Sequence, residues 1–450
     1  MTIENNQPKT VKVGATKFPE ITLDDVAKVL SLTIKDDDAN KKIVFLAMLS
    51  AYTKKCQITV SLNAPSAVGK TYLATEVAKL FPDDDKIERS YASPKSFLHD
   101  DGELDKLKKI KYINVDRKIM IFTELPDPSL QAILRPLLAK DKPAPYAITN
   151  KNKLKTEKII FLGYPAAIFC SANLRMDEQE TTRSILVSPE STEVKIKHAI
   201  EHLIRRAANA DQFNKWLEAQ PGRTSLKERI LAIKQEHVED ILINDTDANL
   251  IHERFFAMLK KPKPSHQRAS RHLLELIRVM ALLNVWHRKQ PDGSVVVNEK
   301  DIDEAFKLWS YFFESQNLGI APAVLNIYKK YIVPAYINKY RLASHDDQNA
   351  MIDNKIGLTS QELSAYYMHE EEATLNNDQL RKQILPQLQA SGLIDIEKPK
   401  IEDNSVDKRS RHIFPKLLTD EDKKYIGIGG VGDGRTEDLD DVYDQLIAML

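Results

Sequence analysis

The chain contains little cysteine and has no excess charge of either sign. Its two cysteines, Cys56 and Cys170, are too few for a disulfide framework or a cysteine-rich zinc site, so we expect buried, unreactive thiols. Basic and acidic residues number 65 each, so net charge favours neither a nucleic acid nor a membrane as partner. Any binding face for DNA must therefore be local.

Long apolar runs are also missing. The polar N-terminal stretch lacks the apolar segment of a secretion signal, and no run of about 18 apolar residues is present to span a membrane. We therefore expect a soluble, cytoplasmic protein without a membrane partner. The 450 residues suffice for about two to four domains, and we find no internal repeats.

The most informative segment is ITVSLNAPSAVGKTYLA. Its β-branched start predicts a buried parallel strand, and the residues from Tyr72 to Leu80 predict a helix. A loop of small residues ending in Gly-Lys-Thr lies between them, which is the context that a phosphate-binding P-loop requires. The candidate nucleotide-binding residues are Ala64, Pro65, Ser66, Ala67, Val68, Gly69, Lys70 and Thr71.

The chemistry of phosphate binding explains this spacing. Loop N–H groups and the helix N-terminus would hold the phosphates of ATP. Lys70 would reach the β- and γ-phosphates, and the Thr71 hydroxyl would bind Mg²⁺. One residue departs from the usual motif, because Ala64 replaces its first glycine and alanine resists dihedrals that glycine permits.

Two later apolar segments end in polar side chains. KIMIFTE ends in Glu124, which we expect to activate the attacking water and to lie at the Mg²⁺ site. Thr123 stands where an aspartate is usual, which weakens the metal arrangement; we expect either slow hydrolysis or Mg²⁺ held mainly by Thr71 and the phosphates. AAIFCSAN ends in Asn173, which suits contact with the γ-phosphate, although asparagine at a strand end also forms turns.

Arginines complete the predicted catalytic set. Arg183 is a candidate arginine finger that reaches a neighbouring subunit's phosphate, and the alternative is an ordinary surface arginine. The helix that begins at Ser265 presents Arg268 and Arg271 near its start, with an apolar face behind them. One of the two could contact nucleotide from a helical lid, or both could be solvated.

Changes of pattern divide the chain into several expected parts. Alternating strands and helices predict an α/β core, after which the pattern is almost entirely helical. The expected parts are a flexible arm (1–20), an N-terminal helical segment (21–55), the ATPase core (56–195), a helical lid with connecting helices (196–345), a winged-helix domain (346–418), and a glycine-rich linker with an acidic C-terminal helix (419–450).

The region 358–416 predicts helix, helix, strand, loop and returning strand, which is the order of a winged helix. Winged helices bind DNA or proteins, and both remain open here. Pro386 lies inside the second helix and is expected to kink it. The basic face would contain Arg381, Lys382, Lys398, Lys400, Lys408, Arg409 and Arg411.

The C-terminal tail contains a stretch, 429–436, that mimics a second P-loop with Arg435 in place of lysine. Acidic residues follow where phosphate would lie, so a flexible linker is the better interpretation. Apolar residues recur at helical spacing from Leu439 to Leu450. They indicate a segment that docks on a replication partner or on its own ring.

The segments QITVSLNAPSAVGKTYL, IMIFTEL, YPAAIFCSAN, TTRSILVSPE and SRHLLELIRVMALLNV, in this order, resemble the AAA+ class of ATPases over roughly residues 40–310. Within that class the chain looks most like minichromosome-maintenance helicases and the related ATPases of phage and mobile-element primase–helicases. The resemblance implies an α/β P-loop core, an all-α lid and a homo-oligomeric ring, with a hexamer as the expected size. It places the sensor arginine at Arg271 rather than Arg268.

The resemblance also implies a β-hairpin within 134–161, ahead of the Asn173 strand. In that class the hairpin points into a central pore and grips DNA. Its tip here would contain Lys151, Lys153 and Lys155, whose charges suit phosphate contact. The alternative is a solvated polar turn.

The function implied by the resemblance is an ATP-dependent DNA helicase or translocase that acts in replication of a mobile element, plasmid or virus, on single-stranded or forked DNA. The alternative that Thr123 favours is an ATP-gated DNA-binding or loader protein with slow hydrolysis. A weaker alternative is an ATPase that remodels a protein partner through the acidic tail. Since no primase module is present, priming is not implied.

Overall fold

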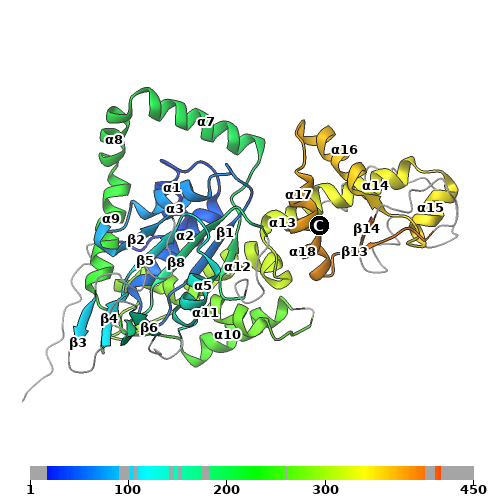
Figure 1. Ribbon diagram of the computed structural model, residues 1–450. Coiled ribbons are helices and arrows are strands. Elements are labelled where there is room, and N and C mark those ends of the chain that lie inside the picture. Colours follow the sequence, from blue (N-terminus) through cyan, green and yellow to red (C-terminus); the bar gives the residue numbers. More distant parts are fainter. Residues whose placement is uncertain are drawn as a thin grey trace, which may run out of the picture.

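The computed structural model describes residues 18–90, 102–105, 110–140, 146–150, 155–174, 182–259, 261–400 and 411–416. The expected linker and acidic helix (419–450), and most of the expected arm, lie outside these residues. Figure 1 shows a larger body built around a sheet and a smaller body formed by the C-terminal helices and strands.

A five-stranded sheet forms the centre of the larger body, in the order β2-β5-β8-β1-β9 (Figure 1). Every neighbouring pair in it is parallel, and all strands except β2 are buried along their whole length, which explains their apolar composition. The predicted α/β class with a parallel sheet is therefore confirmed. The strands are β1 (Thr59–Asn63), β2 (Lys86–Arg89), β5 (Ile119–Phe122), β8 (Ala166–Ser171) and β9 (Ile185–Val187).

Helices that precede the strands in the sequence and helices that follow them pack in one apolar core with the sheet. Helix α2 is almost entirely buried because it packs between the sheet and two later helices. The sequence Thr22-Leu23-Asp24-Asp25 predicts a helix cap, and Thr22 caps α1 through a capping box with Asp25. The helices of this core are α1 (Leu23–Leu30), α2 (Asp38–Leu49), α3 (Lys70–Ala78), α11 (His266–Leu283) and α12 (Glu299–Leu318), with 3₁₀ turns at Ser50–Tyr52, Asp83–Asp85 and Val285–His287.

The region after the sheet is helical, as predicted, with one exception. The helical pattern predicts a helix from Ser225 through Ile243, but helix α9 ends at Gln235, and β10 (Ile241–Leu242) pairs in parallel with β11 (Val295–Val296). None of the described helices is long and apolar enough to cross a membrane. The remaining helices here are α7 (Glu193–Ala208), α8 (Ala210–Glu218), α9 (Pro221–Gln235) and α10 (Asp245–Ala257).

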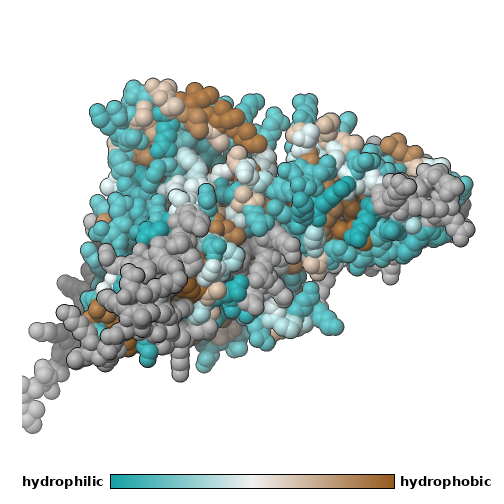
Figure 2. Space-filling view, in the orientation of Figure 1, coloured by the Kyte–Doolittle hydropathy of each residue, from teal (hydrophilic) through white to brown (hydrophobic). Residues whose placement is uncertain are grey.

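Helix α7 crosses the top of the larger body in Figure 1 and presents an apolar band there in Figure 2. The exposed apolar side chains of this helix are Val194, Ile196, Ile200, Leu203 and Ile204.

A second sheet, of order β3-β4-β7-β6, shares a small apolar core with α5 and with strands β5 and β8 of the main sheet. Strands β6 and β7 are antiparallel, with Asn150 opposite Lys155, so the predicted hairpin is confirmed. Its tip, with Lys151 and Lys153, lies outside the described residues. The elements are β3 (Glu103–Asp105), β4 (Ile110–Asn114), α5 (Pro128–Leu138), β6 (Tyr146–Asn150) and β7 (Lys155–Leu162).

Residues 320–416, which we call the C-terminal module, have a separate apolar core. The expected order of helix, helix, strand and returning strand is present, and three short antiparallel strands pair in the order β12-β14-β13. The elements are α13 (Pro322–Ile327), α14 (Val333–Leu342), α15 (His345–Ile352), β12 (Leu358–Thr359), α16 (Ser360–Glu371), α17 (Asn377–Gln379), α18 (Leu385–Ala390), β13 (Ile394–Glu397) and β14 (His412–Pro415).

Two prolines of this module follow widened helical turns. The π-helical turns η4 (Tyr328–Ile332) and η5 (Leu380–Ile384) immediately precede the turns that contain Pro334 and Pro386. A proline lacks an N–H and its ring clashes with the carbonyl four residues earlier, and a wider turn relieves both. The disturbance predicted at Pro386 therefore takes the form of a π turn.

Candidate nucleotide-binding site

Three of the predicted catalytic residues follow adjacent strands of the main sheet. Lys70 follows β1, Asn173 follows β8 and Glu124 follows β5, and these strands lie side by side in parallel. Because neighbouring strands are about 4.8 Å apart, Glu124 lies about 10 Å to the side of the P-loop strand. All three therefore lie at the carboxyl edge of the sheet, where open α/β sheets bind ligands.

Two residues of the P-loop, Ala67 and Gly69, have a positive φ, and Ala64 is not one of them. Gly69 precedes α3 with a φ of 92°, and Ala67 has a φ of 67°, whereas Ala64 has no positive φ. The expectation that Ala64 occupies a backbone position suited to glycine was wrong. The alanine in the left-handed region is Ala67, where an L side chain is disfavoured.

Exchanging Ala67 for glycine is expected to leave the free energy of unfolding unchanged or to raise it by up to about 1 kcal/mol. Glycine removes the cost of holding an L residue in the left-handed region, which stabilises the folded state. This gain offsets the greater backbone entropy that glycine gives to the unfolded state. The control is Ala199→Gly on the exposed face of α7, which should cost about 1 kcal/mol. Urea unfolding measures both, and an equal loss in the two variants would contradict the loop geometry.

The Lys70 ammonium lies over the P-loop. Its Nζ donates hydrogen bonds to the carbonyl oxygens of Ala64 at 2.7 Å and Pro65 at 2.6 Å. The side chain is only 8% exposed, and burial lowers the pKa of Lys70. The loop carbonyls thus hold the cation at the N-terminus of α3, where phosphate oxygens could replace them as acceptors.

Thr71 follows Lys70 on the exposed side of the helix start, and Cys170 is buried near the end of β8. Burial raises the pKa of Cys170 to about 12, and it also raises the pKa of Cys56. Both cysteines are free and buried, as predicted, and neither thiol is ionised at neutral pH.

Asn63, which sequence reasoning missed, ties the P-loop strand to the Asn173 segment. Its Nδ2 donates to the Asn173 carbonyl at 3.3 Å, and its own carbonyl accepts from the Ser188 hydroxyl. The Ser171 hydroxyl accepts from the Asn173 N–H at 3.0 Å. The backbone of Asn173 is therefore fixed, while its side chain is exposed at the site. A polar residue ending a buried strand was the available signal.

Glu124 is exposed beyond the end of β5, and the half-buried Thr123 donates its N–H to the Arg89 carbonyl at 3.0 Å. In the described part of the chain, no group of three or more His, Cys, Asp or Glu could hold a metal ion. The edge offers Mg²⁺ the Thr71 hydroxyl and the Glu124 carboxylate. This donor set fits Mg²⁺, which in phosphate sites keeps several waters and takes its other ligands from the substrate.

The two predicted catalytic arginines lie elsewhere. Arg183 and Arg271 line a cavity of about 190 Å³ together with Gln57 and Thr59. These two residues lie at the start of the P-loop strand, and Ala64 follows its other end. At a rise of about 3.3 Å per residue, the cavity and the P-loop are about 20 Å apart along the strand. Within one chain the arginines therefore lie at the opposite edge of the sheet from Lys70.

This cavity, which we call the basic cavity, also contains Arg268, Lys140 and Glu275. Arg268 donates to the Thr182 hydroxyl, and Lys140 pairs with the Glu275 carboxylate, whose Oε1 is 3.4 Å from Arg271 Nε. Burial acts to raise the pKa of Glu275, but the nearby His272 ring, 3.5 Å from its Oε2, and the charge of Lys140 outweigh burial, so the pKa is lowered. Among the described residues that line the cavity, four cations face the one carboxylate of Glu275, so the cavity suits an anion. Sequence reasoning missed Lys140 and Glu275.

The predicted DNA-binding residues of the C-terminal module are placed in part. Arg381 and Lys382 are exposed on η5, and Arg411 is exposed just before β14. Lys382 also pairs with Asp378 at 3.1 Å. Arg409 lies outside the described residues, and Lys155 begins β7.

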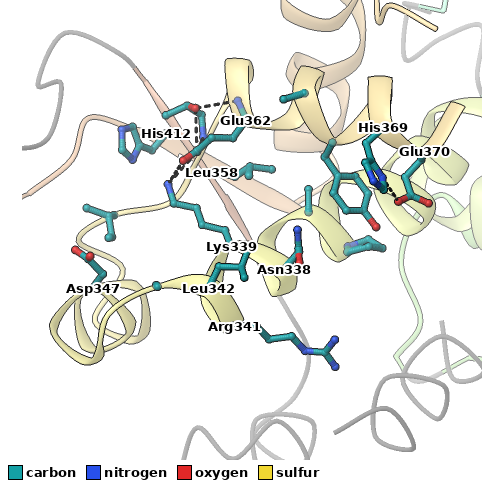
Figure 3. A pocket seen from close by; sticks show the side chains of 17 residues that line it. Asn338, Lys339, Arg341, Leu342, Asp347, Leu358, Glu362, His369, Glu370 and His412 are labelled. Carbon is teal, nitrogen blue, oxygen red and sulfur yellow. Dashed lines mark hydrogen bonds and ion pairs between the residues drawn. The ribbon is translucent and has the colours of Figure 1, made fainter. Parts of the chain in front are cut away.

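A larger cavity, of about 980 Å³, lies within the C-terminal module, away from this chemistry (Figure 3). Its central cation is Lys339, which donates to the Gly357 carbonyl at 2.8 Å and pairs with Glu362. This lysine joins α14 to the start of α16 and is neutralised by that contact. Size alone therefore does not mark the nucleotide site.

No model of a known protein family matches the sequence, and no curated protein matches it either. The residues and their geometry therefore carry the functional argument.

Proposed function

We propose that this chain binds ATP with Mg²⁺ at the carboxyl edge of the main sheet and hydrolyses it. The observation that carries the proposal is the position of Lys70. Its ammonium lies over the loop at the N-terminus of α3, while adjacent strands end at Glu124 and Asn173. This combination offers a phosphate cradle, a carboxylate base and a polar group at one edge.

Each residue then has a defined task in hydrolysis. Glu124 accepts a proton from the water that attacks the γ-phosphorus, and the bond from that phosphorus to the β,γ-bridging oxygen breaks. The Asn173 side chain orients this water. Lys70 and the loop N–H groups stabilise the charge that develops on the phosphate oxygens. Thr71 and Glu124 would hold Mg²⁺, which would supply neutralisation of charge on the β- and γ-phosphates.

The position of the basic cavity supports an oligomer. Arg183 and Arg271 line a cavity at the start of β1, about a strand length from the P-loop of the same chain, and a neighbouring copy could present its nucleotide to them. We propose a homo-oligomeric ring, with a hexamer as the expected size, in which Arg183 acts as a finger on the next subunit. Arg271, the proposed sensor arginine, lies on the same side.

The finer fold proposal is an AAA+ core with a helical lid and a C-terminal winged helix. The parallel sheet and helical region support the first two, and the order of α16, α17–α18, β13 and β14 supports the third. The confirmed hairpin and the exposed Arg381 and Lys382 favour DNA as the substrate of motion. We therefore propose a cytoplasmic ATP-driven DNA helicase or translocase that acts in replication.

Turnover of ATP by the full chain, with and without single-stranded DNA, tests this proposal. DNA is expected to raise the rate. Lys153→Ala is expected to preserve basal hydrolysis within about twofold and to lower unwinding at least about tenfold, because it removes a hairpin-tip phosphate contact. Lys197→Ala on α7 is the matched control. Unchanged unwinding in Lys153→Ala would exclude the hairpin from DNA movement.

Thr123 favours a second candidate function. Because this position offers no carboxylate to Mg²⁺, ATP could switch assembly or DNA binding with slow turnover. Nucleotide binding without turnover, whether or not DNA is present, is the result that this ATP-gated DNA-binding or loader protein predicts. Rapid DNA-stimulated turnover would exclude it.

A further inference from the structure

The residue after Asn173 belongs to the core of the C-terminal module. Leu174 is fully buried among side chains of that module, although it directly follows the β8 segment of the main sheet. Its N–H donates to the Oε1 of Gln383 at 3.1 Å. The backbone next to a predicted γ-phosphate residue is thus held by a side chain from another core.

Gln383 lies on the helix that carries the predicted DNA-binding cations. It follows Arg381 and Lys382 in η5, and its own carbonyl accepts from the Gln387 side chain at 2.7 Å. Arg381 and Lys382 are exposed, whereas Gln383 is half-buried. One helical turn therefore presents cations to solvent and an amide to the nucleotide edge. π-helical turns are often found at functional sites.

A second set of hydrogen bonds connects the C-terminal module to the Asn173 segment. The Ala323 N–H, in α13, donates to the Ser188 hydroxyl at 3.0 Å, and this hydroxyl donates to the Asn63 carbonyl. Asn63 in turn donates to the Asn173 carbonyl. The C-terminal module thus contacts the P-loop strand and the Asn173 segment through separate hydrogen bonds.

We infer that Gln383 is a positioning residue of the nucleotide site, through which the C-terminal module controls the placement of Asn173. This inference rests on the proposed ATPase function. A ligand that moves η5, such as DNA on Arg381 and Lys382, changes the hydrogen bond to Leu174. Coupling between the two sites is reciprocal, so nucleotide also changes the affinity of the module for DNA.

Substitution of the acceptor oxygen tests this role. Gln383→Met removes the acceptor at similar volume, and we expect kcat for ATP to fall about tenfold with KM unchanged within about twofold. Gln383→Glu keeps an oxygen at the same position and should restore kcat to within about twofold of wild type. Gln389→Met, on the exposed side of α18, is the matched control. Stimulation by a thirty-nucleotide oligo-dT should be lost only in Gln383→Met.

The results of these experiments distinguish a failure of the Gln383 inference from a failure of the proposed ATPase function. Equal kcat and equal DNA stimulation in Gln383→Met and wild type, with ATP hydrolysed by both, overturn the inference alone. If the wild type binds ATP without turnover, the inference is tested by measuring amide hydrogen exchange at Leu174 with and without ATP. ATP should then slow exchange at Leu174 in the wild type but not in Gln383→Met, and an equal effect in both overturns the inference. A wild type that binds no nucleotide overturns both proposals.

Discussion

Replacing Lys70 with alanine is expected to lower kcat/KM for ATP at least about 100-fold, because a charge-assisted contact to phosphate is lost within the site. Most other loop contacts come from backbone N–H groups, which this substitution leaves in place. Nucleotide binding is therefore expected to weaken, and hydrolysis to fall further than binding. Initial rates over a range of ATP concentrations, together with titration of a fluorescent ATP analogue, measure the two effects separately.

The matched control for this variant is Lys79→Ala, which removes the same side chain at the other end of α3. Lys79 pairs with Glu76 and does not contact the P-loop, so its loss should leave ATP turnover unchanged. Lys70 also bonds two loop carbonyls, so unfolding curves are needed to show that the variant is folded. Equal turnover by Lys70→Ala and wild type would show that hydrolysis occurs elsewhere.

Changing Glu124 to glutamine is expected to lower kcat about 10²- to 10⁴-fold while ATP still binds, because glutamine keeps the shape but cannot accept a proton from water. The expected product is a trapped, nucleotide-bound protein. Single-turnover hydrolysis and equilibrium binding distinguish this result from a loss of affinity. A ring that requires nucleotide would also become more stable, which sedimentation would detect.

Glu88→Gln is the matched control for this substitution. Glu88 is exposed on β2, the strand beside β5, and pairs in register with Ile121. Glu88 is not one of the residues proposed for the nucleotide site, so its exchange should leave kcat unchanged. Hydrolysis at the wild-type rate by Glu124→Gln would remove Glu124 from the mechanism. Very slow turnover by the wild type itself would point instead to Thr123 and to the gated function.

The local elements were predictable because their signals are local. The β-branched run before the P-loop, the helix after it and the capping box at Thr22 depend on residues a few positions apart. The carboxyl-edge location of Glu124 and Asn173 followed from one further rule, that parallel strands end together at one edge. Within the loop, the same reasoning misplaced the strained alanine, because dihedrals at Ala64 and Ala67 depend on the whole turn.

Other features depend on segments that are far apart in sequence. The basic cavity combines the start of β1, the end of α5, Thr182 and Arg183 ahead of β9, and the start of α11. No periodicity shows that Lys140 meets Glu275, or that Gln383 meets Leu174. The two-residue strand β10 was missed for the same reason, since its partner β11 lies more than fifty residues later in the chain.

The sequence by itself determined the α/β class, the strand, loop and helix that surround Gly69 and Lys70, and the order of elements in the C-terminal module. Hydrophobic period, capping and glycine placement act over a few residues, so they can be read without a fold. Only the tertiary structure decided that Arg183 and Arg271 lie an entire strand length from Lys70, and that Leu174 joins the core of the C-terminal module. Packing brings such residues together because the free energy gained by removing apolar surface from water does not depend on how far apart the residues are in the sequence.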